Sequence, residues 1–122
     1  FNFLGFTHYW GQSRNGSWVV KRQTMRKRQA RAMRSIYVYC RDNRHESVKT
    51  QLKGLNVKLR GIYNYYGIRC NYRSLWMIYQ HARDCWRKWL SRRSHTGFIS
   101  WKKFEQFLDV WKVPEPKITK MV

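Results

Sequence analysis

The strongest constraint on the fold is an apolar seam in the middle of the chain. Its members lie 4, 3, 4, 3 and 4 residues apart: Val48, Leu52, Leu55, Leu59, Ile62 and Tyr66. This spacing places the side chains on one face of a helix of about five turns. Gly67 follows directly, and glycine is common just after a helix ends. We therefore predict a helix that ends at Gly67 and buries this face against other helices.

Three further segments show the same helical period. After Thr24, a predicted N-cap, a first helix carries Met33, Ile36, Tyr37 and Cys40 on one stripe. The segment from the capping candidate Asn71 to just before Ser94 has an apolar face of Leu75, Tyr79, Ala82, Trp86 and Trp89. A shorter helix begins after Ser100 and buries Trp101, Phe104, Leu108 and Trp111. It is predicted to end at Val113, because Pro114 and Pro116 cannot continue it.

The first 23 residues have a different pattern, which predicts a β-hairpin. An aromatic segment, residues 1–7, and Trp18-Val19-Val20 flank Asn15-Gly16, the dipeptide best suited to a two-residue type I′ turn. Such a turn would place Ser13 opposite Trp18. The predicted fold is mainly α, an N-terminal β-hairpin followed by a bundle of three to four helices. Its parts are the hairpin (1–23), the helical domain (24–113) and a tail (114–122).

The charge balance indicates the partner. The chain has 26 Lys and Arg against 6 Asp and Glu, a formal net charge of +20. A charge of this size repels itself unless a polyanion accompanies it, so nucleic acid is the first partner to test and an anionic membrane surface the second. We expect no membrane span, because the longest segment without a charged residue is Phe1 to Ser13, shorter than the roughly 18–20 apolar residues required.

Residues for catalysis or metal binding do not form usable sets. The six carboxylates make no pair that could hold two divalent cations, and the four histidines have no partner at ligand spacing. The three cysteines, Cys40, Cys70 and Cys85, are odd in number and far apart, which fits a reducing interior and not a disulfide framework. We predict no catalytic residue, no metal site and no cofactor in this chain, and no export signal at Phe1, so we expect a cytoplasmic protein and a piece of a longer one.

Three clusters of residues are the candidate nucleic-acid contacts, two of them basic and one that combines a cation with an amide and an aromatic ring. The first is Arg26, Lys27, Arg28, Arg31 and Arg34, at the start of a helix where the macrodipole disfavours cations. The second, off the apolar seam, is Arg60, Asn64 and Tyr65. Between them Gly61 weakens the helix by about 1 kcal/mol, which suggests close approach by a neighbouring helix or by a nucleic-acid strand. The third is Arg87, Lys88, Arg92 and Arg93, at a helix end where the dipole also favours cations.

Three blocks together resemble the C-terminal part of group II intron reverse transcriptases, the intron-encoded maturases. They are Phe1-Asn2-Phe3-Leu4-Gly5-Phe6, Leu59-Arg60-Gly61-Ile62-Tyr63-Asn64-Tyr65-Tyr66-Gly67, and Trp89-Leu90-Ser91-Arg92-Arg93-Ser94. The second block is the most specific. The resemblance covers nearly the whole chain and implies that the hairpin ends a polymerase palm and that the helices form the thumb, or maturase domain.

The resemblance also implies partners and limits. In the family the catalytic aspartates belong to a Tyr-x-Asp-Asp turn upstream of the first block, so the polymerase activity and its Mg²⁺ would belong to the parent protein. The thumb would grip the RNA–DNA primer–template duplex and bind structured intron RNA to assist splicing. The palm and fingers would pack on the hairpin, and the protein would be cytoplasmic, of bacterial type. Two alternatives stay open, a free-standing basic nucleic-acid-binding module and a cationic membrane-active domain.

Overall fold

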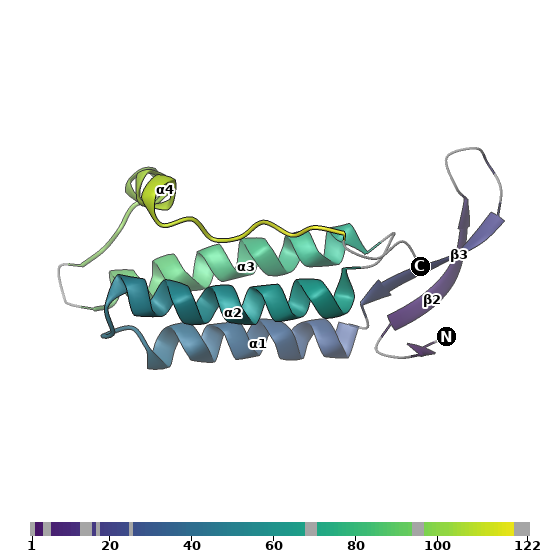
Figure 1. The fold of residues 1–122 in the computed structure, drawn as a ribbon, viewed down its shortest axis with the longest axis horizontal. Helices are drawn as coiled ribbons and strands as arrows, with labels where there is room; N and C mark the ends of the chain where they lie inside the picture. The colour runs from purple at the N-terminus through teal and green to yellow at the C-terminus, as the bar shows by residue number, and fades with distance from the viewer. Residues whose placement is uncertain are drawn as a thin grey trace.

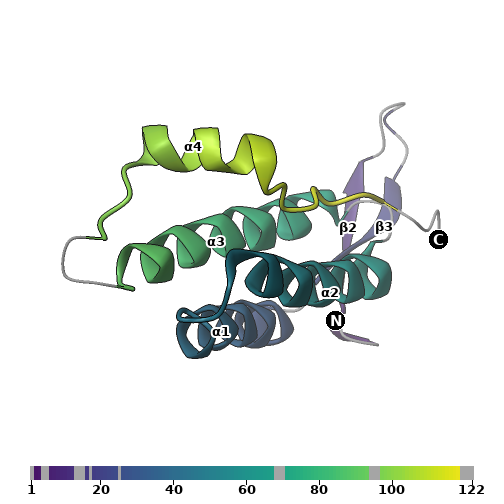
Figure 2. The ribbon, with the colours of Figure 1, turned by 60° about the vertical axis from the view of Figure 1, so that its left-hand side comes forward.

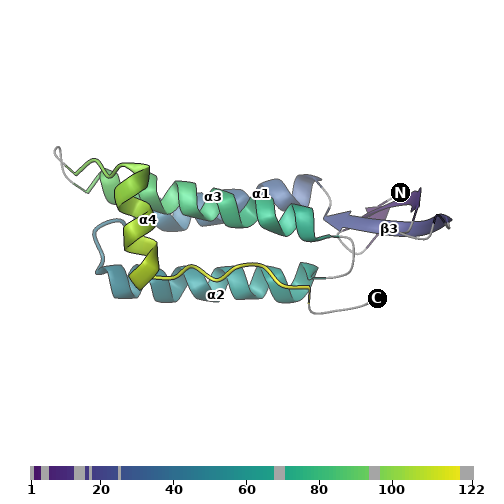
Figure 3. The same cartoon turned by 90° about the horizontal axis from the view of Figure 1, so that it is seen from above.

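The computed structural model describes residues 2–3, 6–12, 16, 18–24, 26–67, 71–93 and 97–118. In these residues the chain is mainly α, with four helices (Figure 1): α1 (Arg26–Asp42), α2 (Val48–Tyr66), α3 (Tyr72–Ser91) and α4 (Trp101–Val110). The first three lie side by side (Figure 2), and α4 crosses one end of the bundle (Figure 3). The predicted mainly α class is confirmed.

Three short strands precede the helices: β1 (Asn2–Phe3), β2 (Phe6–Gln12) and β3 (Trp18–Thr24). They pair antiparallel in the order β1-β2-β3, and β2 and β3 lie beyond one end of the helices (Figure 1). Trp18 pairs with Gln12, not with Ser13 as a two-residue turn requires. Gly16 has a φ of 86°, the left-handed region that the predicted turn requires there, so only the strand register departs from a two-residue turn. Asn15, the other predicted turn residue, is outside the described residues.

The predicted N-cap of α1 is wrong, whereas that of α3 is right in position but not in its hydrogen bonding. Thr24 still pairs with Phe6 in β3, so it is strand and not the N-cap of α1. Asn71 does precede α3, but its side chain makes no capping hydrogen bond. Its Nδ2 instead donates to the Tyr66 carbonyl oxygen at 2.8 Å, which ties the start of α3 to the end of α2. Gly67 follows α2 as predicted, with a φ of −78° that other residues also adopt.

The core lies between α1, α2 and α3, where the predicted stripes meet. Leu55 and Leu59 are fully buried, and so are Ile36 of α1 and Leu75 of α3. Leu52 and Ile62, at the edges of the α2 seam, are only half-buried and pack against this core. The seam therefore identifies the buried face, and its outer members line the edges of that face.

The α4 helix packs on the bundle through aromatic rings. Phe104 is fully buried, with its ring 6.1 Å from that of Trp86 and edge to face. Trp101, predicted to be buried, is 42% exposed. The helix ends at Val110, three residues before the predicted end at Val113. Beyond Val110 the chain turns back toward α2 (Figure 3).

The segment after α4 lies along the bundle as far as Ile118, whereas the sequence analysis treated it as a tail. It runs beside α2 as an extended chain (Figure 3). Val113 is buried, and the Tyr63 hydroxyl donates to the Pro114 carbonyl oxygen at 2.9 Å. Within the described ranges, no helix is both long and apolar enough to span a membrane.

Candidate nucleic-acid interface

A cationic stripe runs along the first half of α1. All five predicted members are exposed: Arg26, Lys27, Arg28, Arg31 and Arg34. The first turn of α1 has no acidic residue. Two ion pairs occur in the described part of the chain, Arg41–Asp42 and Arg83–Glu105, and neither involves this stripe. The stripe is therefore a row of exposed cations without carboxylate partners there, as a phosphate-binding surface requires.

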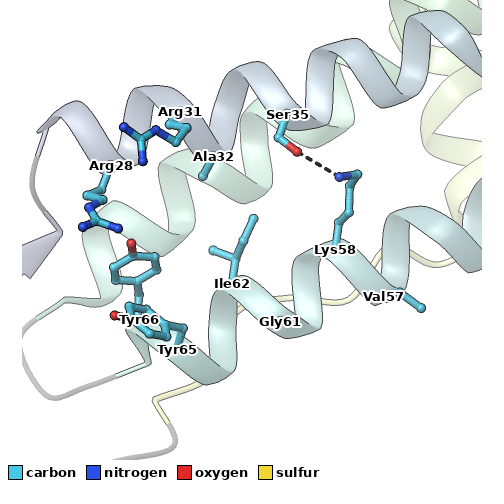
Figure 4. Close-up of a pocket in the computed structure, with 10 residues that line it drawn as sticks. All are labelled: Arg28, Arg31, Ala32, Ser35, Val57, Lys58, Gly61, Ile62, Tyr65 and Tyr66. Carbon is cyan, nitrogen blue, oxygen red and sulfur yellow. Dashed lines mark hydrogen bonds between the residues drawn. The ribbon is translucent and has the colours of Figure 1, made fainter. Parts of the chain in front are cut away.

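An open groove of about 590 Å³ separates this stripe from α2 (Figure 4). The α1 wall is Arg28, Arg31, Ala32 and Ser35, and the α2 wall is Val57, Lys58, Gly61, Ile62, Tyr65 and Tyr66. The fold thus places Arg28 and Arg31 of the first predicted cluster across one groove from Tyr65 of the second, more than thirty residues away in the sequence. A second hollow of about 470 Å³ shares Arg31, Ser35 and Lys58 with the first and extends it toward Arg34 and Tyr39.

Lys58 is a groove residue that the sequence analysis missed. Its Nζ donates to Ser35 Oγ at 2.8 Å, across the groove between the two helices (Figure 4). It also lies 5.8 Å from the centre of the Tyr39 ring, a cation–π distance. Its signal in the sequence is its place directly before the buried Leu59, which puts it beside the seam. Lys58 adds a third cation to the groove, opposite Arg28 and Arg31.

Gly61 faces open space. A Cβ atom built on Gly61 would meet nothing within 4 Å among the described atoms. A neighbouring helix therefore does not explain this glycine, and of the two expectations only the nucleic-acid strand stays a proposal. The close approach between helices occurs at Gly54 instead, where a Cβ atom would overlap the ring and hydroxyl of Tyr39.

The remaining residues of the second cluster divide into two groups. Tyr65 is 54% exposed and lines the groove, and its ring packs edge to face on Tyr66, with 4.6 Å between centroids. Arg28 reaches toward the Tyr66 hydroxyl from α1 (Figure 4). Burial raises the pKa of Tyr66, and the positive charge of Arg28 opposes that rise. Arg60 and Asn64 are exposed on α2 but do not line the groove.

The third cluster lies apart from the groove, and its Arg87 and Lys88 side chains contact other residues of the fold. The Arg87 guanidinium stacks 4.4 Å from the centre of the Trp101 ring, and Nη1 donates to the Ile99 carbonyl oxygen at 3.0 Å. Lys88 lies 5.0 Å from the centre of the Tyr37 ring. Because Tyr37 is nine residues beyond Arg28, Lys88 is roughly 14 Å farther along the α1 axis. Arg92 and Arg93 are exposed and remain candidates for contact.

No three His, Cys, Asp or Glu side chains gather as a metal site in the residues that the structure describes. Cys40 and Cys85 are buried free thiols, and burial raises their pKa to about 12 and about 11. His81 is occupied by the Met33 carbonyl oxygen, 2.8 Å from its Nε2. Cys40, Cys85 and His81 thus lie in or beside the core where α1 meets α3.

No family model matches this chain, and no curated protein and no solved structure is significantly similar to it.

Proposed function

We propose that this chain is the RNA-binding thumb, or maturase domain, of a group II intron-encoded reverse transcriptase. In this role it grips the RNA–DNA duplex leaving the polymerase site and binds the structured intron RNA to assist its splicing. The observation that supports this best is the α1–α2 groove. Gly61, Ile62, Tyr65 and Tyr66 of the block that most resembles the family line it, opposite the cations of α1.

The charge distribution supports a grip on phosphates. Arg28, Arg31 and Arg34 follow one another at three-residue intervals on α1, so they are about 4.5 Å apart along its axis. Each phosphate that such a side chain neutralises releases condensed counterions, which provides most of the affinity of proteins for nucleic acids. These contacts hold the nucleic acid in position without reading its sequence.

Contacts that discriminate between RNAs are assigned to Arg60, Asn64 and Tyr65. Their side chains offer a guanidinium plane, an amide and an aromatic ring, all exposed on α2. Proteins recognise structured RNA by such stacking and hydrogen-bonding groups. The proposed parent protein carries out polymerisation with its own Mg²⁺ and acts in the cytoplasm. Its palm and fingers pack on residues 1–23.

The experiment is a competition between ligands. Fluorescence anisotropy would measure binding of the chain to a labelled group II intron RNA, with unlabelled RNA–DNA duplex, unrelated structured RNA or phosphatidylserine-containing vesicles as competitors. We expect intron RNA and duplex to compete well and vesicles poorly, because the apolar stripes of the helices are used in the core. Stronger competition by vesicles would favour the membrane-active alternative. Equal competition by every RNA would favour a free-standing basic module.

A further inference from the structure

We propose that the α1–α2 groove holds one unpaired nucleotide of the bound RNA. Its base would lie on the apolar floor beside Tyr65, and its phosphate would contact Arg28 and Arg31. The inference rests on the proposed function, because it names the part of an RNA that this surface would take.

The size and lining of the groove fit a single base. Its volume of about 590 Å³ is within the range of sites that bind small ligands. The apolar members of the two walls form the floor of the groove. They are Ala32 of the α1 wall and Gly61 and Ile62 of the α2 wall, with Val57 at one side (Figure 4). A paired base inside a helix has its faces covered by its neighbours, so only an unpaired base from a loop, bulge or end could lie on this floor.

Aromatic and polar groups are placed to bind such a base. Tyr65 is 54% exposed at the rim, and stacking on an aromatic ring is the usual way that proteins hold an unpaired base. Ser35 Oγ accepts a hydrogen bond from Lys58 Nζ, so the Ser35 hydroxyl proton is available to a carbonyl of the base. Base and protein would then meet through one ring face and one hydrogen bond.

The charges of the walls fit the phosphate. Three of the ten lining residues are cations and none is an acid: Arg28 and Arg31 come from α1, and Lys58 comes from α2. The phosphate of the same nucleotide would contact Arg28 and Arg31, which are both exposed on the rim opposite Tyr65 (Figure 4). An apolar peptide would leave these cations without a partner, which is why we assign a nucleotide to the groove.

Gly61 supplies the space. In the middle of an exposed helix, glycine destabilises the helix more than any other residue except proline. A Cβ atom there would meet no protein atom within 4 Å, and Gly61 is one of the residues that line the groove. Packing of the protein therefore does not demand glycine at this position, but an occupant of the groove would.

The test compares two RNA duplexes of equal length and charge, one that is blunt and fully paired and one in which each strand carries a single bulged nucleotide. Binding of each to the parent chain, to Gly61→Leu and to Tyr65→Ala would be measured by anisotropy at one salt concentration. We expect the parent to prefer the bulged RNA by about 5- to 150-fold, the range that stacking of one base provides. Gly61→Leu and Tyr65→Ala should remove most of this preference, because the affinity for the bulged RNA should fall toward the affinity of the same variant for the paired duplex.

The control is Ala30→Leu, which adds an exposed leucine to α1 outside the groove and should keep the preference. Equal binding of both RNAs by the parent would overturn the nucleotide pocket and leave the proposed function standing. A preference that survives in Gly61→Leu would also overturn it. Failure of the parent to bind either RNA would contradict the proposed function itself, so the two failures are distinguishable.

Discussion

Tyr39 of α1 lies directly over Gly54 of α2. Its hydroxyl is within hydrogen-bonding distance of the Thr50 and Gln51 carbonyl oxygens, at 3.3 Å and 3.2 Å. A Cβ atom on residue 54 would overlap the Tyr39 ring. The two helices can therefore approach closely at this end of the bundle only because residue 54 has no side chain. At Gly61, two turns farther along α2, the helices leave the groove open.

The two glycines give a matched pair of substitutions. Gly54→Ala should destabilise the chain, because the overpacking cost of about 1–3 kcal/mol and the displaced Tyr39 hydroxyl outweigh the better helix propensity of alanine. Gly61→Ala should stabilise it by up to about 1 kcal/mol, since the new methyl group meets no protein atom. Urea denaturation of both variants measures the difference. Equal shifts in the two free energies of unfolding would show that the close approach at Gly54 is wrong.

The seam of α2 is tested by Leu59→Ala. Leu59 is fully buried, and removal of a buried leucine side chain beyond Cβ costs about 2–5 kcal/mol. That is a large part of the stability of a domain of this size. Val57→Ala is the control, because Val57 is 68% exposed on the same helix and its loss should change the free energy of unfolding by less than about 0.5 kcal/mol. Similar melting temperatures for the two variants would contradict the bundle.

A buried polar contact joins α2 to α3. The Trp86 indole N–H donates to Gln51 Oε1 at 3.0 Å, and Gln51 Nε2 donates to the Glu46 carbonyl oxygen at 2.8 Å. Gln51→Leu should cost about 1–3 kcal/mol, because it leaves the buried indole N–H without an acceptor. Chemical denaturation followed by tryptophan fluorescence measures this cost. In Trp86→Phe, which lacks that N–H, Gln51→Leu should cost less, and an equal cost in both backgrounds would exclude the coupling.

The helical part of this fold could be predicted because its apolar periods are long and regular. Val48 to Tyr66 forms one helix with the predicted limits, and Leu55 and Leu59 lie in its core. The ends of helices that depend on contacts with neighbouring elements could not be predicted from the spacing of apolar residues. Thr24 has the chemistry of an N-cap, yet pairing with Phe6 keeps it in a strand. Val113 precedes a proline, yet the chain leaves α4 earlier and buries Val113.

The candidate site was predictable residue by residue, but its assembly was not. The position of Arg28, Arg31 and Tyr65 off the apolar stripes indicated that they are exposed. These residues face each other across one groove because of the way α1 packs on α2. A local sequence pattern does not encode that packing. Lys58 was missed for the same reason, since it flanks the seam and becomes a groove residue only beside Ser35. Arg87 looked like a phosphate ligand, and only the position of Trp101 shows that it also holds α4.

The buried thiols give a prediction about pH. Burial raises the pKa of Cys40 to about 12 and that of Cys85 to about 11, from an ordinary value of 9.0. The neutral thiols thus stabilise the folded chain fully below about pH 9, and this contribution is lost as the pH rises toward 11 and 12, because unfolded thiols ionise first. In Cys70→Ser, neither thiol should react with a disulfide reagent at pH 8 until denaturant is added. Rapid reaction of either thiol in the folded protein would contradict their burial.

The central claim is that the cations of α1 hold RNA phosphates, and a salt titration tests it most directly. With about six phosphate contacts on a duplex, log K against log salt should fall with a slope near −5, from roughly −0.9 for each phosphate. Arg28→Gln, Arg31→Gln and Arg34→Gln together should flatten this slope by up to about 3 units and weaken binding to all sequences alike.

The matched control removes the same charge elsewhere, with Lys102→Gln, Lys103→Gln and Lys112→Gln on or just after α4, where all three side chains are exposed. Binding of parent, α1 variant and α4 variant to one RNA–DNA duplex would be measured by anisotropy over a range of salt concentrations. The account predicts that the α1 variant loses slope and the α4 variant keeps it. A parental slope in the α1 variant, or an equal loss in both variants, would contradict the grip of α1 on the nucleic acid.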